Sequence, residues 1–177
     1  MRVTRRGLGR LVWLGGPALL ALPGCGFHPL YANGESGPGA ARAGLGVVSV
    51  GIIPERQGQL LRQALQARFD HGDASPAKRF DLAVSFRIDS ELQGYQYDNT
   101  VTRIRLIGRA TWTLATRDAA RSTVTSGSAR SVDALNTFDQ QYFAQDMETA
   151  TIQRRIAEAV ADQITTQLAL YFEKHPV

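Results

Sequence analysis

Hydrophobic and polar positions alternate along the chain in patterns that separate strands from helices. Residues 47–53 form an apolar, β-branched run that stops at Pro54, which is typical of a strand. Two later runs, residues 80–88 and 102–114, have apolar side chains at every second position. This alternation predicts strands with one buried and one solvated face. Residues 122–134 form a third such run, rich in serine and threonine, whose weak apolar face predicts an edge position or a largely solvated face.

Two other segments, residues 55–71 and 146–172, have apolar residues every four positions, as amphipathic helices do. Gly72 supplies a natural stop for the first helix. The apolar stripe of the first segment comprises Leu61, Leu65 and Phe69. The longer stripe of the second comprises Ile152, Ile156, Val160, Ile164 and Leu168.

The order strand, helix, three strands, helix predicts an α+β fold. Its architecture is a two-layer α/β sandwich, in which two helices cover one face of a four-stranded mixed sheet. The crossover helix allows the first two strands to run parallel, whereas the later strands should form antiparallel hairpins. Residues 47–177 are expected to hold this domain. Residues 32–46 are rich in glycine and alanine without periodicity, so we expect a flexible tether there.

The first residues have the pattern of an export signal. Residues 1–24 contain four arginines and no acidic residue, and include a 12-residue apolar run at 11–22. That run is shorter than the roughly 20 residues needed to span a bilayer, which favours a signal peptide. It ends at Pro23-Gly24-Cys25, which resembles a bacterial lipobox. Cys25 is therefore expected to receive lipid after removal of residues 1–24, and the lipid would anchor the chain to a membrane.

Charge and cysteine content argue against several classes of function. The 177-residue chain has 20 basic and 16 acidic residues. Because four of the arginines lie within residues 1–24, the remainder is formally neutral, and a nucleic-acid partner is not expected. Cys25 is the single cysteine, and the three histidines lack the spacing of metal ligands. We therefore expect no metal, no cofactor and no enzymatic activity.

Aromatic residues next to predicted turns are candidates for a protein interface. Tyr95 and Tyr97 flank Gln96 at the expected hairpin tip, and Tyr142 and Phe143 precede the last predicted helix. Exposed aromatic side chains suit an interface because they bury a large area on binding. The alternative is that they pack locally.

Arg103, Arg105 and Arg109 share the polar face of their strand. Guanidinium groups bind phosphate in a bidentate manner, so Arg103 and Arg105 are candidates for contact with a phosphorylated ligand. The alternative is a solvated sheet face on which the arginines pair with carboxylates of the neighbouring strand. Those carboxylates belong to Asp81, Asp89 and Glu91.

Two stretches resemble the LptE family of lipopolysaccharide-assembly lipoproteins. The first, Cys25-Gly26-Phe27-His28-Pro29-Leu30-Tyr31, has the form of the mature start of α-proteobacterial members. The second extends from Tyr95-Gln96-Tyr97-Asp98 through Arg103 to Trp112. The resemblance covers essentially the whole mature chain, and it implies the same two-layer fold that the periodicity predicts.

The resemblance also implies a function and a location. The protein would be anchored by lipid to the outer membrane and would face the periplasm and the lumen of a large β-barrel partner, an LptD-like translocon. In a 1:1 complex it would act as barrel plug and folding aid, and the pair would assemble lipopolysaccharide at the cell surface. The alternative, from another class, is a periplasm-facing lipoprotein that binds a soluble ligand or inhibits an envelope enzyme.

Family members are associated with basic residues in the hairpin loop and just before the last helix, where lipopolysaccharide is contacted. This chain has Gln96 and Asp98 in the first place, and residues 140–141 are glutamines in the second. Those roles are therefore not transferred to these positions. Arg103 and Arg105 become the candidates for lipopolysaccharide contact.

Overall fold

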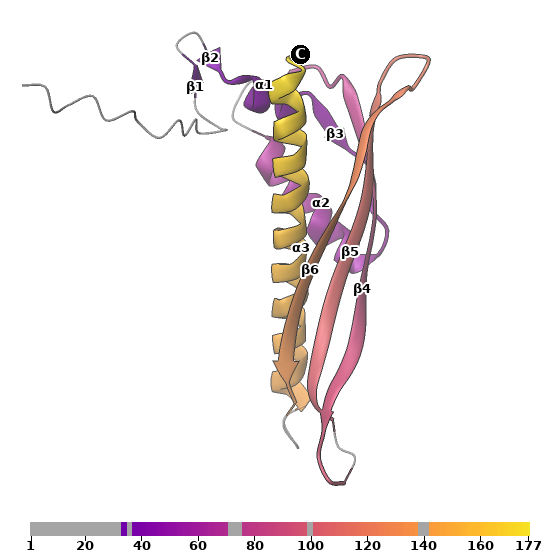
Figure 1. The fold of residues 1–177 in the computed structure, drawn as a ribbon, viewed down its shortest axis with the longest axis vertical. Helices are drawn as coiled ribbons and strands as arrows, with labels where there is room; N and C mark the ends of the chain where they lie inside the picture. The colour runs from indigo at the N-terminus through magenta and orange to yellow at the C-terminus, as the bar shows by residue number, and fades with distance from the viewer. Residues whose placement is uncertain (1–32, 35–36, 71–75, 99–100, 138–141) are drawn as a thin grey trace, which may run out of the picture.

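The computed structural model has two layers, a four-stranded sheet and the helices that cover one of its faces (Figure 1). It describes residues 33–34, 37–70, 76–98, 101–137 and 142–177. The elements in chain order are β1 (Asn33–Gly34), β2 (Gly37–Pro38), α1 (Ala40–Gly46), β3 (Val48–Val50), α2 (Glu55–Phe69), β4 (Phe80–Tyr95), β5 (Val101–Thr116), β6 (Thr123–Asn136) and α3 (Tyr142–Lys174).

The strand order β3-β4-β5-β6 confirms the predicted four-stranded mixed sheet. β3 runs parallel to β4, pairing Val48 with Phe80 and Val50 with Leu82, because the chain returns through the crossover helix α2. The β4–β5 and β5–β6 pairings are antiparallel, as expected of hairpins. β6 lies at one edge of the sheet, in agreement with its weak apolar face.

The long strands make the molecule a rod. β4 and β5 have 16 residues each, more than the alternation alone predicted. At about 3.3 Å per residue such a strand spans roughly 50 Å, and the 33 residues of α3 span about 50 Å as well. Figure 1 shows α3 lying along the sheet, with α1 and β3 near the C-terminus and α2 beside the middle of α3. We call the opposite end, with the β4–β5 turn and the start of α3, the distal end.

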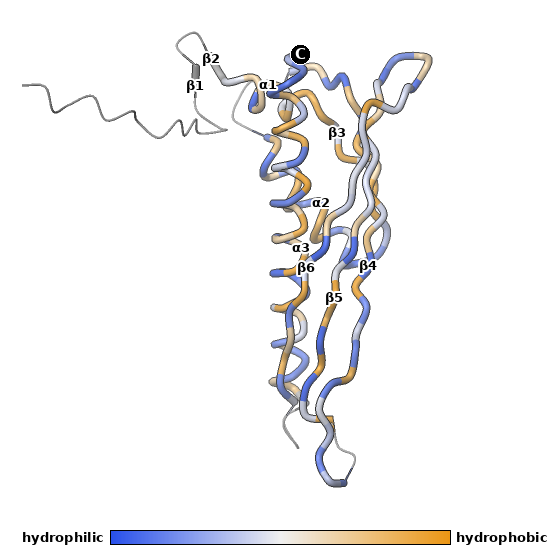
Figure 2. Tube along the Cα trace, in the orientation of Figure 1, coloured by the Kyte–Doolittle hydropathy of each residue, from blue (hydrophilic) through white to orange (hydrophobic). Residues whose placement is uncertain are grey.

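The core lies between the sheet and the helices and follows the predicted periodicity. On β4, Leu82, Val84 and Phe86 are buried, and Ala83 and Ser85 between them are exposed. Figure 2 shows the same alternation of hydrophobic and hydrophilic positions along the strands. Burying each large apolar side chain contributes about 1.5–3 kcal/mol. The buried stripe of α3 comprises Ile152, Ile156, Val160, Ile164, Leu168 and Phe172.

Gly108 on β5 allows α3 to approach the sheet closely. A Cβ atom at this position would lie 2.3 Å from Cγ2 of Ile156 and 3.3 Å from Cε2 of Phe86. Both neighbours belong to the buried core, so they have little room to move. Glycine is therefore required where the helix crosses this strand.

α3 begins at Tyr142, four residues before the predicted start at Asp146. The extra turn includes Phe143. The sequence lacks glycine and proline between these positions, so nothing in it interrupts the helix. The helix therefore extends beyond the apolar stripe by which it was recognised.

Residues 40–46 form α1, so the prediction of a flexible tether over residues 32–46 is wrong for this part. Ala41 and Leu45 are fully buried, and α1 packs against α3. A Cβ atom on Gly44 would lie 2.2 Å from Cγ of Phe172, so glycine permits the contact. Small residues here serve close helix packing, and burial of Leu45 offsets the low helix propensity of glycine.

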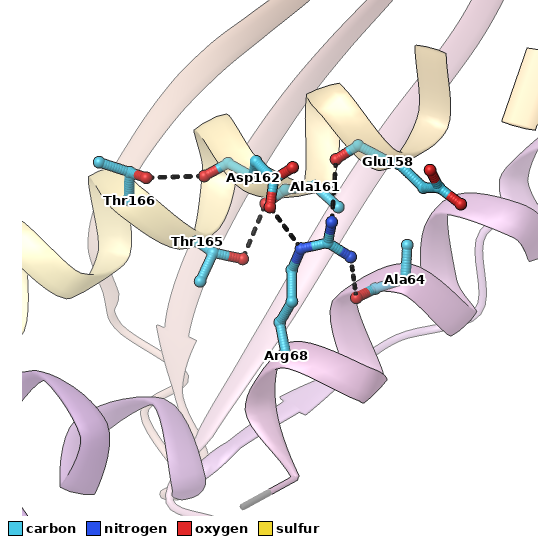
Figure 3. Close-up of polar contacts among 7 residues, drawn as sticks. All are labelled: Ala64, Arg68, Glu158, Ala161, Asp162, Thr165 and Thr166. Carbon is cyan, nitrogen blue, oxygen red and sulfur yellow. Dashed lines mark hydrogen bonds and ion pairs between the residues drawn. The ribbon is translucent and has the colours of Figure 1, made fainter. Parts of the chain in front are cut away.

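α2 is tied to α3 by Arg68 (Figure 3). Its Nε donates to Oδ1 of Asp162 at 2.7 Å, and one terminal nitrogen donates to the carbonyl oxygen of Glu158 at 3.4 Å. The other terminal nitrogen donates to the carbonyl oxygen of Ala64 on its own helix at 2.8 Å. Because Asp162 is largely exposed, this ion pair adds little stability and mainly sets the orientation of the two helices.

Candidate functional site

The distal end carries a group of exposed apolar side chains. Tyr95 and Tyr97 at the hairpin tip are 61% and 110% exposed, which argues against local packing within the hairpin. Phe143 and Met147, one turn apart on α3, are 80% and 58% exposed. Leu92, near the end of β4, is also exposed. Apolar side chains left in water at one end of a rod are typical of a surface that another molecule covers.

Gly94 is an irregular position near the end of β4, just before the two tyrosines. This residue has a φ of +73°, which other residues rarely adopt, and a Cβ atom there would lie 2.5 Å from Oγ1 of Thr102. The β4–β5 register skips Gly94 and resumes where Tyr95 pairs with Val101. Glycine therefore suits this position.

Two of the predicted site residues lie wholly or partly outside the described residues. Cys25, the expected lipidation site, lies outside the described residues. Tyr142 is the first residue of α3, but its side chain lies outside the described part. Figure 1 shows the start of α3 at the same end as the β4–β5 turn, so the structure brings Phe143 and the two tip tyrosines to one end of the molecule.

The outer face of the sheet, which faces away from the helices, carries the predicted arginine stripe. Arg105 forms an ion pair with Glu91, and Arg109 forms one with Asp89, both across the β4–β5 pair. These contacts match the alternative in which the arginines pair with neighbouring carboxylates. Asp81 pairs with Arg117, in the turn after β5, at 3.2 Å.

Arg103 differs from its neighbours on the stripe. It is exposed, and no ion pair to it is found among the residues that the structure describes. Its cross-strand neighbours on β4 and β6 are Gln93 and Asn136, which are both neutral. Of the two candidates for anion contact, Arg103 therefore has the less compensated charge.

A row of three arginines crosses the same face. Arg87 pairs with Arg109 in the β4–β5 register, and Arg109 pairs with Arg130 in the β5–β6 register. Like charges placed directly opposite destabilise a sheet. Asp89 relieves this row by contacting Arg109 and, at 3.4 Å, the Nε of Arg87. The row could not be predicted from the sequence, because it depends on the register of three strands.

A groove of about 300 Å³ opens on the helix-covered face, towards the distal end. Its floor is apolar, and its rim is polar and includes Gln57 at the start of α2 and Gln153 on α3. The groove exists because α2 covers only the part of β4 that lies away from the distal end. Its other lining residues are Ile88, Ser90, Leu92, Ile104, Leu106, Leu135 and Thr149.

Two glutamines of α3 cap the free edge of β6, a contact that the sequence pattern does not predict. Gln163 accepts a hydrogen bond from the backbone N–H of Arg130 at 3.1 Å and donates to its carbonyl oxygen at 3.0 Å. Gln167 donates to the carbonyl oxygen of Ser128 at 3.0 Å and accepts from Nε1 of Trp112 at 3.1 Å. Polar residues on a helix face give no sign of such contacts until the helix is placed against the strand.

The described residues contain no group of three or more histidine, cysteine, aspartate or glutamate side chains that could hold a metal ion. In the same part of the chain no helix is both long and apolar enough to cross a membrane.

Solved structures of several bacterial lipoproteins share this fold. A lipoprotein from Caulobacter crescentus is 23% identical with a TM-score of 0.58, and the match covers 75% of this chain and 95% of that one. Rare lipoprotein B from Shewanella oneidensis is 12% identical with a TM-score of 0.52, covering 70% and 94%. Lipoprotein B from Nitrosomonas europaea is 14% identical with a TM-score of 0.51, covering 70% and 81%. At these identities the likeness concerns the fold alone. Among curated proteins none matches the chain.

A family model gives the sequence-level relation. The model for LptE, described as lipopolysaccharide-assembly, matches residues 45–168. These residues include most of the sheet-and-helix domain, from the end of α1 to the last turns of α3. The match, the predicted β-α-β-β-β-α order, which is observed from β3 to α3, and the neighbouring folds agree. The chain belongs to the LptE family of lipopolysaccharide-assembly proteins.

Proposed function

We propose that the protein is the lipid-anchored partner of a β-barrel outer-membrane protein, an LptD-like translocon. In this role it fills the barrel lumen as a plug, aids barrel folding and, with the barrel, assembles lipopolysaccharide at the cell surface. The match to the LptE family over residues 45–168 carries the proposal. The role is one of binding and assembly and needs no catalytic residues.

The shape of the molecule supports insertion into a lumen. A rod about 50 Å long, the length set by 33 residues of α3, can extend through the height of a membrane barrel, whose apolar band is about 25 Å tall. The outer sheet face is polar, with arginines and carboxylates in cross-strand pairs, which suits the polar interior of a barrel. Tyr95 and Tyr97 at the distal end would lead the insertion.

The anchor proposed at Cys25 limits where the domain can lie. The first packed helix begins at Ala40, fifteen residues later. A fully extended chain of that length spans about 50 Å at most. Lipid on Cys25 would therefore keep the domain beside the periplasmic mouth of a barrel in the same membrane.

Within this proposal, Arg103 is a better candidate than Arg105 for contact with lipopolysaccharide. The guanidinium of Arg105 already binds Glu91, whereas Arg103 has neutral neighbours and is exposed. A phosphate group can be held by a free guanidinium with two parallel hydrogen bonds. Arg103 also lies near the distal end, two residues after Val101, which pairs with Tyr95.

A pull-down from the native envelope tests the proposal. Tagged full-length protein is recovered in mild detergent, and the proteins that accompany it are identified and quantified by mass spectrometry. We expect one large β-barrel at about a 1:1 ratio. The double variant Tyr95→Ser/Tyr97→Ser should reduce its recovery at least about tenfold, because exposed tyrosines contribute strongly to interfaces. Leu170→Ser is the matched control, since Leu170 is 49% exposed but near the other end of α3.

Recovery of the lipidated protein without a barrel would contradict the proposal. Recovery with a soluble envelope enzyme instead would favour the alternative, a ligand-binding or inhibitory lipoprotein. The groove is the feature that such a function would use. Its volume of about 300 Å³ lies at the lower limit for small-molecule sites.

A further inference from the structure

The half of β4 that lies towards the distal end has a free edge. β3 pairs with β4 only from Phe80 to Leu82, and the last bond of this pair runs from the N–H of Gly51 to the carbonyl oxygen of Leu82. Beyond Gly51 the chain leaves the border, and α2 runs back towards the end of the molecule that holds the C-terminus of the chain. Figure 1 shows β4 continuing alone along the border of the sheet towards the distal end. No backbone hydrogen bond to this border is found from Ile88 to Gly94 within the part of the chain that the structure describes.

The strand register shows which backbone groups point outwards. The N–H of Phe80 and the carbonyl oxygen of Leu82 both bond to the β3 side. Because backbone groups alternate direction along a strand, the N–H and C=O of the even-numbered residues face this border, and the odd-numbered residues bond to β5. Within the described part of the chain, Ile88, Ser90 and Leu92 therefore offer a row of donors and acceptors without a backbone partner.

The two edges of the sheet differ in whether side chains satisfy their outward backbone groups. On β6, Gln163 satisfies the outward N–H and C=O of Arg130, and Gln167 satisfies the C=O of Ser128. Native proteins commonly protect exposed edges in such ways because an open edge accepts a further strand. The border of β4 from Ile88 to Gly94 contains no proline or lysine. No side chain of the described residues caps this border in the way that Gln163 and Gln167 cap the β6 edge.

The groove lies directly beneath the open border. Ile88, Ser90 and Leu92 belong both to the border and to the groove lining, and the apolar side chains of Ile104 and Leu106 form its floor. A strand added beside β4 would point every second side chain into this groove. Apolar side chains at those positions would bury Leu92, which is now 55% exposed.

The charges on the outer face of the sheet indicate which kind of strand can bind to this border. Asp89 and Glu91 lie on the outer face of the border segment. An antiparallel pair of two copies of this chain, centred on Ser90, would place Asp89 of each copy opposite Glu91 of the other, which is unfavourable. A strand from another protein with lysine or arginine on its outer face would instead complement these carboxylates.

We propose that the border of β4 from Ile88 to Gly94 binds an extended segment of the β-barrel partner as a fifth strand, with apolar side chains in the groove and basic side chains beside Asp89 and Glu91. This inference rests on the proposed function, because it takes the barrel as the partner. Main-chain hydrogen bonds supply affinity in such strand addition, and the alternate side chains supply specificity.

Proline substitutions test the proposal. Ser90→Pro removes an outward N–H and leaves the β4–β5 hydrogen bonds intact, because proline is tolerated where the N–H faces away from the sheet. Val132→Pro is the matched control, since Val132 has the same outward orientation on the β6 edge and lies at the same height, opposite Ile107. Both variants should keep the melting temperature of the wild type within a few degrees. In the mild-detergent pull-down, Ser90→Pro should reduce barrel recovery at least tenfold, and Val132→Pro should leave it unchanged.

The outcomes separate this inference from the proposed function. Equal barrel recovery with both proline variants overturns the added strand and leaves the barrel partnership in place. No barrel with the wild type overturns both. Amide hydrogen exchange of the wild-type protein gives an independent measurement, which also serves if Ser90→Pro unfolds. The amides of Ser90 and Leu92 should exchange at least a hundredfold more slowly in the complex than in the isolated protein, and unchanged exchange overturns the proposal.

Discussion

Individual polar residues are important in this fold mainly where one side chain forms hydrogen bonds with two elements at once. Gln167 links the indole N–H of buried Trp112 to the carbonyl oxygen of Ser128. The side-chain amide thus accepts a hydrogen bond from a donor in the core and donates one to an acceptor at the sheet edge. A buried group left without its partner costs about 1–3 kcal/mol.

Gln167→Leu should lower the free energy of unfolding by about 1–3 kcal/mol, because the N–H of Trp112 loses its acceptor. Urea denaturation monitored by tryptophan fluorescence measures this change. Thr166→Val is the control, because its exposed hydroxyl bonds to the carbonyl of Asp162 in its own helix and, among the described residues, to no other group. That change should stay within about 0.5 kcal/mol. Equal stability of the two variants would show that the Gln167 contacts are not needed.

Among the elements, α1 is the one whose role was least expected. It is a short helix of small residues, yet Leu45 and Ala41 are fully buried against the rest of the core. α1 packs on the C-terminal part of α3, where Gly44 lies against Phe172. The folded domain therefore starts near Ala40.

Leu45→Ala should lower the free energy of unfolding by about 2–5 kcal/mol, as large-to-small changes in a packed core do. A chain shortened to begin at Val47 should melt at a lower temperature than one beginning at Gly39. Both changes are measured by thermal and urea unfolding. If residues 40–46 were a tether, neither change would affect stability.

On the scale of the whole molecule, the rod has two ends with different roles. The end near α1 is connected through the N-terminal segment to the expected lipid site, and the distal end carries the exposed aromatic side chains. The free border of β4 lies towards the distal end. A molecule anchored at one end and covered by a partner at the other matches the proposed position in a barrel.

Cys25→Ser should remove the lipid anchor and release the protein from the outer-membrane fraction into the soluble periplasmic fraction. Metabolic labelling with an alkyne-bearing fatty acid should mark the wild type and leave the variant unlabelled. The melting temperature of the domain should not change, because Cys25 precedes the packed elements. A labelled variant, or a wild type without label, would contradict lipidation at this residue.

Local periodicity was enough to determine the elements from β3 to α3 and their order. Alternation on β4 and the four-residue stripe of α3 follow from the geometry of a strand and a helix, which needs no knowledge of the neighbours. The parallel β3–β4 pair follows from the crossover connection. The outer-face position of Arg103 and Arg105 followed in the same way, as did the placement of Tyr95 and Tyr97 at a turn.

The tertiary structure decided the features that depend on register and on which surfaces meet. The pairing of Arg105 with Glu91 requires the β4–β5 register, and capping of β6 by Gln163 requires α3 to lie against that edge. α1 escaped recognition because its small residues gain stability only from the surface of α3. The sequence by itself thus determined the elements from β3 to α3, the export signal pattern and the family resemblance. Only the packed molecule shows where the groove and the free edge of β4 remain, because both are defined by what α2 and β3 do not cover.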